Sequence, residues 1–596
     1  MNYPITQRIA DLRRIMLDQK VAACIITNND PHSSEYSAEH WLARTWISGF
    51  TGAAGNVVVT PGRGGLWTDG RYYIQAEEQL SGTGLSLYKT KEPETPTIPE
   101  WLADTLPAKS LVAVDGRSIS YAFYQSLVKA FEPKSIRLSL VKDLIAPLWE
   151  DRPPRSLAPV FNHDLQYAGI ETREKIKKVQ AWMSEEAVGG LLVSALDDVM
   201  WTLNIRGGDV PYCPVTEAYL LVTEQRSLLF IGRDKVPLAV EDTLMEQGVT
   251  IADEEEVAEL INQLLEGGRL AFDANSTDSL MISRISQSIE LREVSSPVAE
   301  MKAVKNSTEM ASLEKTLCMD GVAMVKFMCW LDNQVPIGQV SELSAEAQLR
   351  AYRKQNPQYI SDSFRTIAGF AEHGAKMHYA ASQESDAVVD KSHFFLVDSG
   401  GQYLGGTTDI TRTFHFGTPT PKQRKDYTLV LKAVIRLSRT KFLKGSTGAN
   451  LDIMARGVLW EHGIDYKCGT GHGVGLCLNV HEGPQYFSQN PKEVALKPGM
   501  VITNEPGVYR EGEYGIRIEN MMKVVEADEN EFGVFYGFET ITLAPIATQM
   551  LEMPMLNKEE IDWINAYHRR VRNVLSPLLE VPQKAWLDQA TRSLGA

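Results

Sequence analysis

FFLVDSGG at residues 394–401 opens the region that decides the fold, and four more segments follow it: GGTTDITRTF (405–414), GTGHGVG (469–475), TNEPGVY (503–509) and GIRIEN (515–520). Each segment carries one side chain that binds hard or borderline divalent cations: Asp398, Asp409, His472, Glu505 and Glu519. Four carboxylates and one imidazole hold too much negative charge for a single ion. The set therefore predicts two divalent ions that share carboxylate bridges.

Short β-strands are predicted to carry these ligands. Residues 394–397 form an apolar run that ends at Asp398, where Ser-Gly-Gly predicts a turn. In residues 407–414, a period of two puts Asp409, Thr411 and Thr413 on one face. The two runs predict a hairpin that brings Asp398 and Asp409 together. Taken singly, each ligand has a plainer interpretation as a turn or loop residue, but five in order on the strands and turns of one region favour a metal site.

These motifs, together with His378 in KMHYA and His481 in NVHEGP, resemble the pita-bread metallopeptidases of family M24. The motifs are most similar to those of three-domain aminopeptidase P (Xaa-Pro aminopeptidase), and the resemblance covers nearly the whole chain. The resemblance implies an enzyme that hydrolyses the N-terminal Xaa-Pro bond of peptides through a hydroxide bridging two divalent ions. Mn²⁺ is the preferred ion, with Co²⁺ or Zn²⁺ as alternatives. It also implies two creatinase-like α/β domains followed by a pita-bread α+β catalytic domain.

The resemblance implies a role for each ligand. Asp409 and Glu519 bridge the ions, Asp398 chelates one of them, and His472 and Glu505 hold the other. Glu505 is also the proton acceptor and later the donor to the leaving nitrogen.

Three further side chains are expected around the ions. His481 hydrogen-bonds the carbonyl oxygen as it becomes an oxyanion, and His378 contacts the residue after the scissile bond. Arg517 shares a strand face with Glu519 and is predicted to pair with Asp409 and fix its orientation.

One departure from the family pattern lies in KCGTGHGVG, where many relatives have histidine in place of Cys468. A thiol there changes substrate affinity or pH dependence, or is only a small packing residue. Two other functions stay open: a prolidase, which shares the ligands but cuts only Xaa-Pro dipeptides, and a non-catalytic peptide-binding relative. GTGHGVG does not have the GxGxxG spacing of a dinucleotide-binding loop.

Composition limits the partners and the compartment. The formal net charge of −16 argues against nucleic acid and anionic membrane surfaces as partners. The N-terminal MNYPITQRIADLRR has no hydrophobic signal core, and the six cysteines form no CxxC pairs. We therefore expect a cytoplasmic protein, and the family resemblance implies that it acts on peptides with proline at the second position.

The 596 residues predict several domains. Residues 172–215 repeat the order of helix, buried strand and Gly-rich segment seen near the N-terminus, and DRPPR (151–155) marks the boundary between the copies. The predicted domains are residues 1–155, 156–300, 301–545 and a helical extension, 546–596. The extension packs on the catalytic domain or helps to form a homodimer. Arg71 belongs to an Arg–Asp network of the first domain, or reaches substrate in a dimer.

Overall fold

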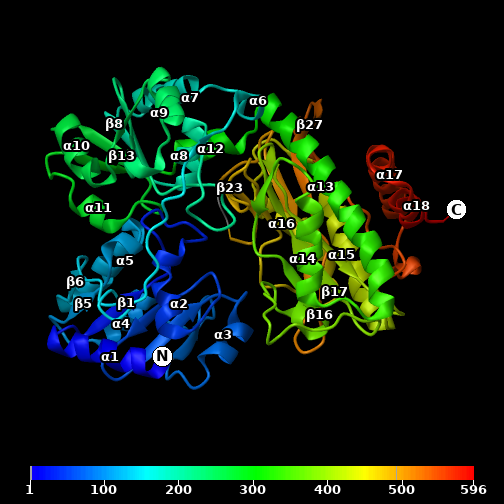
Figure 1. Cartoon of the computed structure of the whole chain (residues 1–596), viewed down its shortest axis with the longest axis horizontal. Helices are drawn as coiled ribbons and strands as arrows, with labels where there is room; N and C mark the ends of the chain where they lie inside the picture. The colour runs from blue at the N-terminus through cyan, green and yellow to red at the C-terminus, as the bar shows by residue number, and fades with distance from the viewer. Residues whose placement is uncertain (1–2, 491–492, 596) are drawn as a thin grey trace. The chain divides into compact units, whose positions relative to one another are not determined.

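The computed structural model describes residues 3–490 and 493–595 and divides into two compact units. The first unit comprises Met1–Leu165 and Ile170–Val298, and the second comprises Gln166–Gly169 and Ala299–Ala596. In Figure 1 the first unit runs from blue to green and the second from green to red. Each unit has its own sheets and its own hydrophobic core.

Two six-stranded sheets of the same topology form the first unit. One has the order β4 (Ser86–Lys89), β3 (Gly64–Thr68), β2 (Asn56–Val59), β1 (Ala23–Ile26), β5 (Leu111–Ala113), β6 (Arg137–Ser139). The other has the order β12 (Val249–Ala252), β11 (Ser227–Phe230), β10 (Tyr219–Thr223), β8 (Gly190–Val193), β13 (Arg269–Phe272), β14 (Glu290–Glu293). In the first sheet β1, β2 and β3 pair antiparallel, and in the second sheet β8, β10 and β11 do the same. All other neighbouring strands in both sheets are parallel. The predicted internal repeat is confirmed.

Helices flank both sheets, and several begin where the sequence supplies a cap. Thr97 and Glu100 form a capping box at the start of α4, and Ser120 accepts the Phe123 N–H at the start of α5. The helices of the first half are α1 (Ile5–Asp18), α2 (Ala43–Ser48), α3 (Tyr73–Leu80), α4 (Ile98–Thr105) and α5 (Tyr121–Phe131). Those of the second half are α7 (Thr172–Glu185), α8 (Leu196–Leu203), α9 (Leu238–Glu246), α10 (Val257–Leu264) and α11 (Ser279–Ser283). The short strands β7 (Phe161–Asn162) and β9 (Ile205–Arg206) pair with each other.

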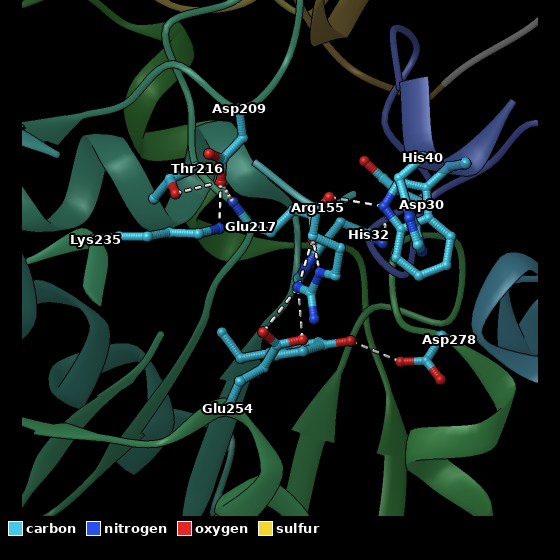
Figure 2. Close-up of polar contacts among 12 residues, drawn as sticks. Asp30, His32, His40, Arg155, Asp209, Thr216, Glu217, Lys235, Glu254 and Asp278 are labelled. Atoms are coloured by element: carbon cyan, nitrogen blue, oxygen red, sulfur yellow. Dashed lines mark hydrogen bonds and ion pairs between the residues drawn. The ribbon is translucent and has the colours of Figure 1, made fainter. Parts of the chain in front are cut away.

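Buried polar side chains join the two halves of the first unit around Arg155, which lies at the end of the Pro-rich boundary. Arg155 donates from Nε to Glu217 Oε2 at 2.9 Å and from Nη2 to Glu254 Oε2 at 2.8 Å (Figure 2). Glu217 also accepts the indole N–H of Trp41 at 2.7 Å, so one carboxylate binds both the first half and the boundary segment. The halves are held by charge-assisted hydrogen bonds as well as by apolar packing.

Antiparallel strands covered by helices form the second unit, as the sequence predicts for the catalytic domain. One sheet has the order β16 (Ile367–Phe370), β17 (Phe395–Ser399), β20 (Ile410–Phe414). The largest has the order β21 (Phe442–Leu443), β28 (Gly533–Thr540), β27 (Asn520–Asn530), β24 (Val501–Asn504), β22 (Gly471–Gly473), β23 (Glu482–Phe487). Smaller sheets join β15 (Tyr359–Asp362), β18 (Gly401–Tyr403) and β19 (Gly406–Thr407), and β25 (Gly507–Arg510) with β26 (Tyr514–Arg517).

The long helix α13 (Ser307–Gln334) begins with a capping box at Asn306. Asn306 accepts the backbone N–H groups of Thr308 and Glu309, and the Glu309 carboxylate accepts the Asn306 N–H. After α12 (Pro297–Ala303) and α13, the unit contains α14 (Glu342–Arg353), α15 (Pro421–Ser438) and α16 (Gly448–Trp460). Helix α15 ends at Ser438, and Phe442 and Leu443 then pair with β28 as strand β21.

The C-terminal extension forms two helices, α17 (Lys558–Leu575) and α18 (Val581–Ala590). Asn557 and Glu560 form a capping box at the start of α17. Helices α17 and α18 are drawn in red near the C-terminus in Figure 1. Helix α17 contacts α13 and α15, and Tyr567 on it is buried in the main core of the unit. Packing on the catalytic domain, one of the two alternatives for this segment, is therefore observed.

Two absences hold for the described part of the chain. No helix there is both long enough and apolar enough to span a membrane. None of the six cysteines in residues 3–490 and 493–595 forms a disulfide.

Candidate metal centre

The five predicted ligands converge in the second unit. Asp398 is in β17, Asp409 directly precedes β20, His472 is in β22, Glu505 directly follows β24 and Glu519 directly precedes β27. Ligand atoms of Asp398, Asp409 and Glu519 all lie within 4.8 Å of one another, and so do those of His472, Glu505 and Glu519. The two groups share Glu519, so the arrangement has the form of two adjoining cation sites.

Backbone pairing fixes these positions. Strands β17 and β20 pair antiparallel with Asp398 opposite Thr411, and residues 400–409 between them form the turns and short strands of a neighbouring sheet. The Glu519 N–H donates to Thr411 O at 3.1 Å, and the Thr411 hydroxyl donates to Glu519 Oε2 at 2.8 Å. The Glu505 N–H donates to Thr470 O at 2.8 Å. The predicted approach of Asp398 and Asp409 is confirmed.

Close backbone contact explains one glycine of GTGHGVG. A Cβ on Gly471 would lie 2.0 Å from Thr503 O, so only glycine lets β22 approach β24 at the residue before His472. This contact sets the distance between the His472 strand and the Glu505 strand.

Crowded carboxylates dominate the electrostatics of the centre. Burial, together with the negative charges of Asp409 and Glu505, raises the pKa of Asp398 to about 7, although the Arg517 guanidinium opposes the rise. The pKa of Glu519 is raised well above its ordinary value, first by burial and then by the charge of Asp409. Without a cation, the folded protein retains protons here.

His472 responds to the same charges in the opposite sense. Burial alone would lower its pKa, but the hydrogen bond that His472 donates to Asp409 and the negative charge of Glu505 outweigh burial and raise the pKa to about 9. Its Nε2 lies 3.4 Å from Asp409 Oδ2 and 3.3 Å from Glu505 Oε1. Its Nδ1 lies 2.8 Å from Gly473 O, which accepts the proton and leaves Nε2 as the coordinating atom.

Unpaired oxygens show that the cluster fits metal ions. Asp398 Oδ1, Asp409 Oδ1 and Glu519 Oε1 are buried and have no hydrogen-bond partner among the described residues. A buried carboxylate oxygen without a partner is strongly destabilising unless a cation binds it. Three such oxygens in one cluster of oxygen and imidazole donors match the ligand preference of Mn²⁺, Co²⁺ or Zn²⁺.

The predicted pairing of Arg517 with Asp409 is wrong. Arg517 instead binds Asp398 Oδ2, at 3.1 Å from Nε and 2.5 Å from Nη2, and its Nε also donates to Thr411 Oγ1 at 3.1 Å. The register explains the difference, because Asp398 lies opposite Thr411 across β17 and β20, whereas Asp409 lies two residues before Thr411, ahead of the paired part of β20. Arg517 still orients a carboxylate of the cluster.

Tyr509 is a contact that the sequence did not reveal. Its hydroxyl accepts a hydrogen bond from Arg517 Nη1 at 2.6 Å, so it braces Arg517 from the side away from Asp398. The antiparallel pairing of β25 with β26 brings the two residues together.

The two predicted non-ligand histidines differ in how closely they join the cluster. The ring of His481 meets the ring of His472 edge-on, with centroids 4.3 Å apart, and its nitrogen lies within 4.8 Å of ligand atoms of Asp409 and His472. His378 is half-buried and follows Met377, whose carbonyl oxygen lies 3.5 Å from Arg517 Nη2. The substrate roles of both histidines stay predictions.

The structure shows the surroundings of Cys468 and of Arg71, and the functional roles of both residues stay predictions. Cys468 is half-buried against the main core of the unit, and its carbonyl oxygen accepts a hydrogen bond from Arg456. Arg71, in the first unit, forms a two-bond pair with Asp69, 2.8 Å from Nε to Oδ1 and 2.8 Å from Nη2 to Oδ2. The Arg–Asp network predicted for the first domain is therefore present.

Family models match the chain in four consecutive segments. The Creatinase/Prolidase N-terminal domain matches residues 8–148 and again residues 151–309, Metallopeptidase family M24 matches residues 311–526, and the C-terminal region of peptidase M24 matches residues 534–594. The two N-terminal matches correspond to the two sheets of the first unit.

Similar proteins cover the whole chain. Aminopeptidase P2 of Arabidopsis thaliana is 35% identical, covering 99% of this chain and 89% of its own. A probable Xaa-Pro aminopeptidase P of Coprinopsis cinerea is 37% identical, covering 98% of both chains. The X-prolyl aminopeptidase of Caenorhabditis elegans, described as a cytosolic enzyme with a di-nuclear active site, is 31% identical and superimposes with a TM-score of 0.94 over 100% of both chains. An Xaa-Pro dipeptidase of Bacillus anthracis is 25% identical with a TM-score of 0.51, and covers 63% of this chain and 99% of its own.

Proposed function

The chain belongs to the aminopeptidase P family of M24 metallopeptidases and is a metal-dependent Xaa-Pro aminopeptidase, and on that premise we propose which residues carry the reaction. Asp398, Asp409, His472, Glu505 and Glu519 hold the two divalent ions. The observation that carries this assignment is the pair of ligand groups that share Glu519, each within 4.8 Å. Mn²⁺ is the ion we propose, because four carboxylates and one imidazole suit a hard-to-borderline cation.

Two divalent ions, when bound, supply a nucleophile from water at neutral pH and polarise the scissile carbonyl. Glu505 is the residue we assign to proton transfer. Its side chain is 19% exposed, whereas those of Asp398 and Asp409 are 9% and 4% exposed, so Glu505 is the most open to an incoming peptide. It accepts the proton of the attacking water and donates a proton to the leaving proline nitrogen.

The two other histidines bind the reacting peptide in this proposal. His481 donates a hydrogen bond to the carbonyl oxygen as negative charge develops on it, supported by the contact of its ring with His472. His378 contacts the residue after the scissile bond. Arg517 orients Asp398 and is in turn braced by Tyr509.

Proline at the second position explains why a dedicated peptidase is needed. The Xaa-Pro bond is a tertiary amide without an N–H, so a peptidase that relies on that donor does not hold it.

We propose that the enzyme is a cytoplasmic homodimer. The cytoplasmic location is in keeping with the Caenorhabditis elegans relative, which is described as cytosolic. Light scattering coupled to gel filtration tests the oligomeric state.

Peptide hydrolysis by chelator-stripped protein tests the proposal. We expect that Mn²⁺ restores release of the first residue from Xaa-Pro-Xaa tripeptides and longer Xaa-Pro peptides, and not from matched Xaa-Ala peptides. Cleavage of Xaa-Pro dipeptides alone would identify a prolidase. No cleavage with two ions bound would refute the catalytic assignment.

A further inference from the structure

Arg412 is a buried arginine whose hydrogen-bond acceptors, within the described part of the chain, are all neutral oxygens. It lies in β20 between Thr411 and Thr413 and is 1% exposed. The five N–H groups of its guanidinium face six acceptors, three of them around Nη2: Pro545 O (2.9 Å), Thr411 O (2.9 Å), Glu519 O (2.6 Å), Asn520 Oδ1 (2.8 Å), Ala544 O (3.0 Å) and the Tyr567 hydroxyl (3.1 Å). A permanent charge is buried at such a site only when its donors are satisfied, so each acceptor matters.

Half of these acceptors belong to the strands of the candidate metal centre. The carbonyl oxygens of Thr411 and Glu519 and the side chain of Asn520 meet at the Arg412 guanidinium. On the opposite face of β20, the Thr411 hydroxyl donates to the Glu519 carboxylate. Arg412 therefore links the two backbone segments that carry Asp409 and Glu519, because its guanidinium binds carbonyl oxygens of both.

The other acceptors belong to the segment that leads into the C-terminal extension and to the extension itself. Pro545 and Ala544 offer carbonyl oxygens, and Tyr567 offers its hydroxyl from α17. The Tyr567 hydroxyl also lies 2.9 Å from Ala544 O, to which it donates its own proton. Because Tyr567 is 6% exposed and packed in the core, it fixes both the guanidinium and the chain segment beside it.

We infer that Arg412 is the positioning residue of the two bridging carboxylates, Asp409 and Glu519, and that Tyr567 of the C-terminal extension holds it in place. The inference rests on the proposed role of those carboxylates as metal ligands. It extends the metal centre to α17, which contributes no ligand. Partners that orient ligands from behind set metal affinity, so the extension tunes the binding of the ions.

Metal titration of the chelator-stripped full-length protein tests this inference without reference to turnover. Isothermal titration with Mn²⁺ gives the stoichiometry and the dissociation constants, and the visible spectrum of the Co²⁺ form reports ligand geometry. We expect Tyr567→Phe to reduce the affinity for the more weakly bound Mn²⁺ ion about 10-fold. Arg412→Met should reduce this affinity about 10- to 100-fold, the range typical of residues that orient metal ligands. Both variants should change the Co²⁺ spectrum.

Asn565→Ala is the matched control. Asn565 lies on the same helix and exchanges hydrogen bonds with Leu594, at 3.1 Å and 2.8 Å, without contacting Arg412. This variant loosens the extension and should retain wild-type metal affinity and spectrum. Equal loss of affinity in Asn565→Ala and Tyr567→Phe would mean that only general stability is involved, and would overturn the inference.

Wild-type affinity and spectrum in Tyr567→Phe overturn the inference whatever Arg412→Met does. Tyr567→Phe removes a single oxygen from a packed side chain, so the test stands even where Arg412→Met does not fold. Failure of the proposed function looks different. In that case the wild-type protein itself binds fewer than two ions or leaves Xaa-Pro peptides intact.

Discussion

In the metal-free protein, the free energy of unfolding of the second unit should fall as the pH rises. Asp398 accounts for a large part of this pH dependence. Its pKa is about 7 in the folded protein, against an ordinary value of 3.8. Between these values the folded protein holds a proton that the unfolded chain releases. The free energy of unfolding therefore falls by about 1.4 kcal/mol per pH unit, on the order of 4 kcal/mol in all.

His472 acts in the same direction at higher pH. Its pKa is about 9 in the folded protein, against an ordinary 6.5, so the stability from its proton is complete below pH 6.5 and is lost as the pH rises through 9. Both groups therefore predict a metal-free protein that is most stable in mild acid. Added Mn²⁺ should reverse the trend, because ligands bind a cation only after they lose their protons.

Urea unfolding of the chelator-stripped protein at a series of pH values measures this slope. Hydrogen–deuterium exchange of peptides that cover β17 and β20 reads the second unit separately from the first. Asp398→Asn imitates the protonated carboxyl, so the metal-free variant should match the wild type near pH 4 and exceed it by up to about 4 kcal/mol near pH 8. A wild-type slope that is flat or rising, or equal slopes in the two proteins, would refute the reasoning.

Three other predictions concern single side chains. Glu505→Gln should lower kcat about 10²-fold or more with KM little changed, because the proton acceptor is lost; rapid-quench assays with an Xaa-Pro peptide measure it, and wild-type kcat would exclude the role. Arg517→Met should reduce the free energy of unfolding of the metal-free protein at pH 8 by about 3–5 kcal/mol, since Asp398, ionised above its pKa of about 7, loses its buried partner, and the double variant with Asp398→Asn should recover most of the loss. Lys235→Met should destabilise the first unit by a similar ~3–5 kcal/mol, because Asp209 lies 2.7 Å from the Lys235 ammonium and both are buried (Figure 2); calorimetry should show only the first unit melting earlier, and an unchanged transition would contradict it.

Local signals in the sequence predicted much of this structure. The strands that carry Asp398 and Glu505 are apolar runs closed by turn residues, and the capping boxes at Asn306 and Asn557 mark helix starts because each is complete within four residues. The convergence of the ligands was predictable because motif order and residue type point to one chemistry.

Contacts that depend on register between distant strands were not predictable. The alignment of β17, β20 and β26 decides which carboxylate Arg517 binds. It places Asp398, opposite Thr411, beside the Arg517 guanidinium. The environment of Arg412 is set by a helix more than a hundred residues later, which no local pattern encodes. The same reason hid the hydrogen bond between Trp41 and Glu217 in the first unit.

The order of the ligands along the chain bears on biosynthesis. Asp398 leaves the ribosome long before Glu519, the residue shared by both ligand groups, and Tyr567 follows later still. A growing chain that has exposed only Asp398 and Asp409 has two carboxylates and no closed site, which is too few ligands to retain a divalent ion against cellular competition. With these residues as ligands, neither cation site is complete until Glu519 has been made, so metal loading follows the synthesis of most of the chain.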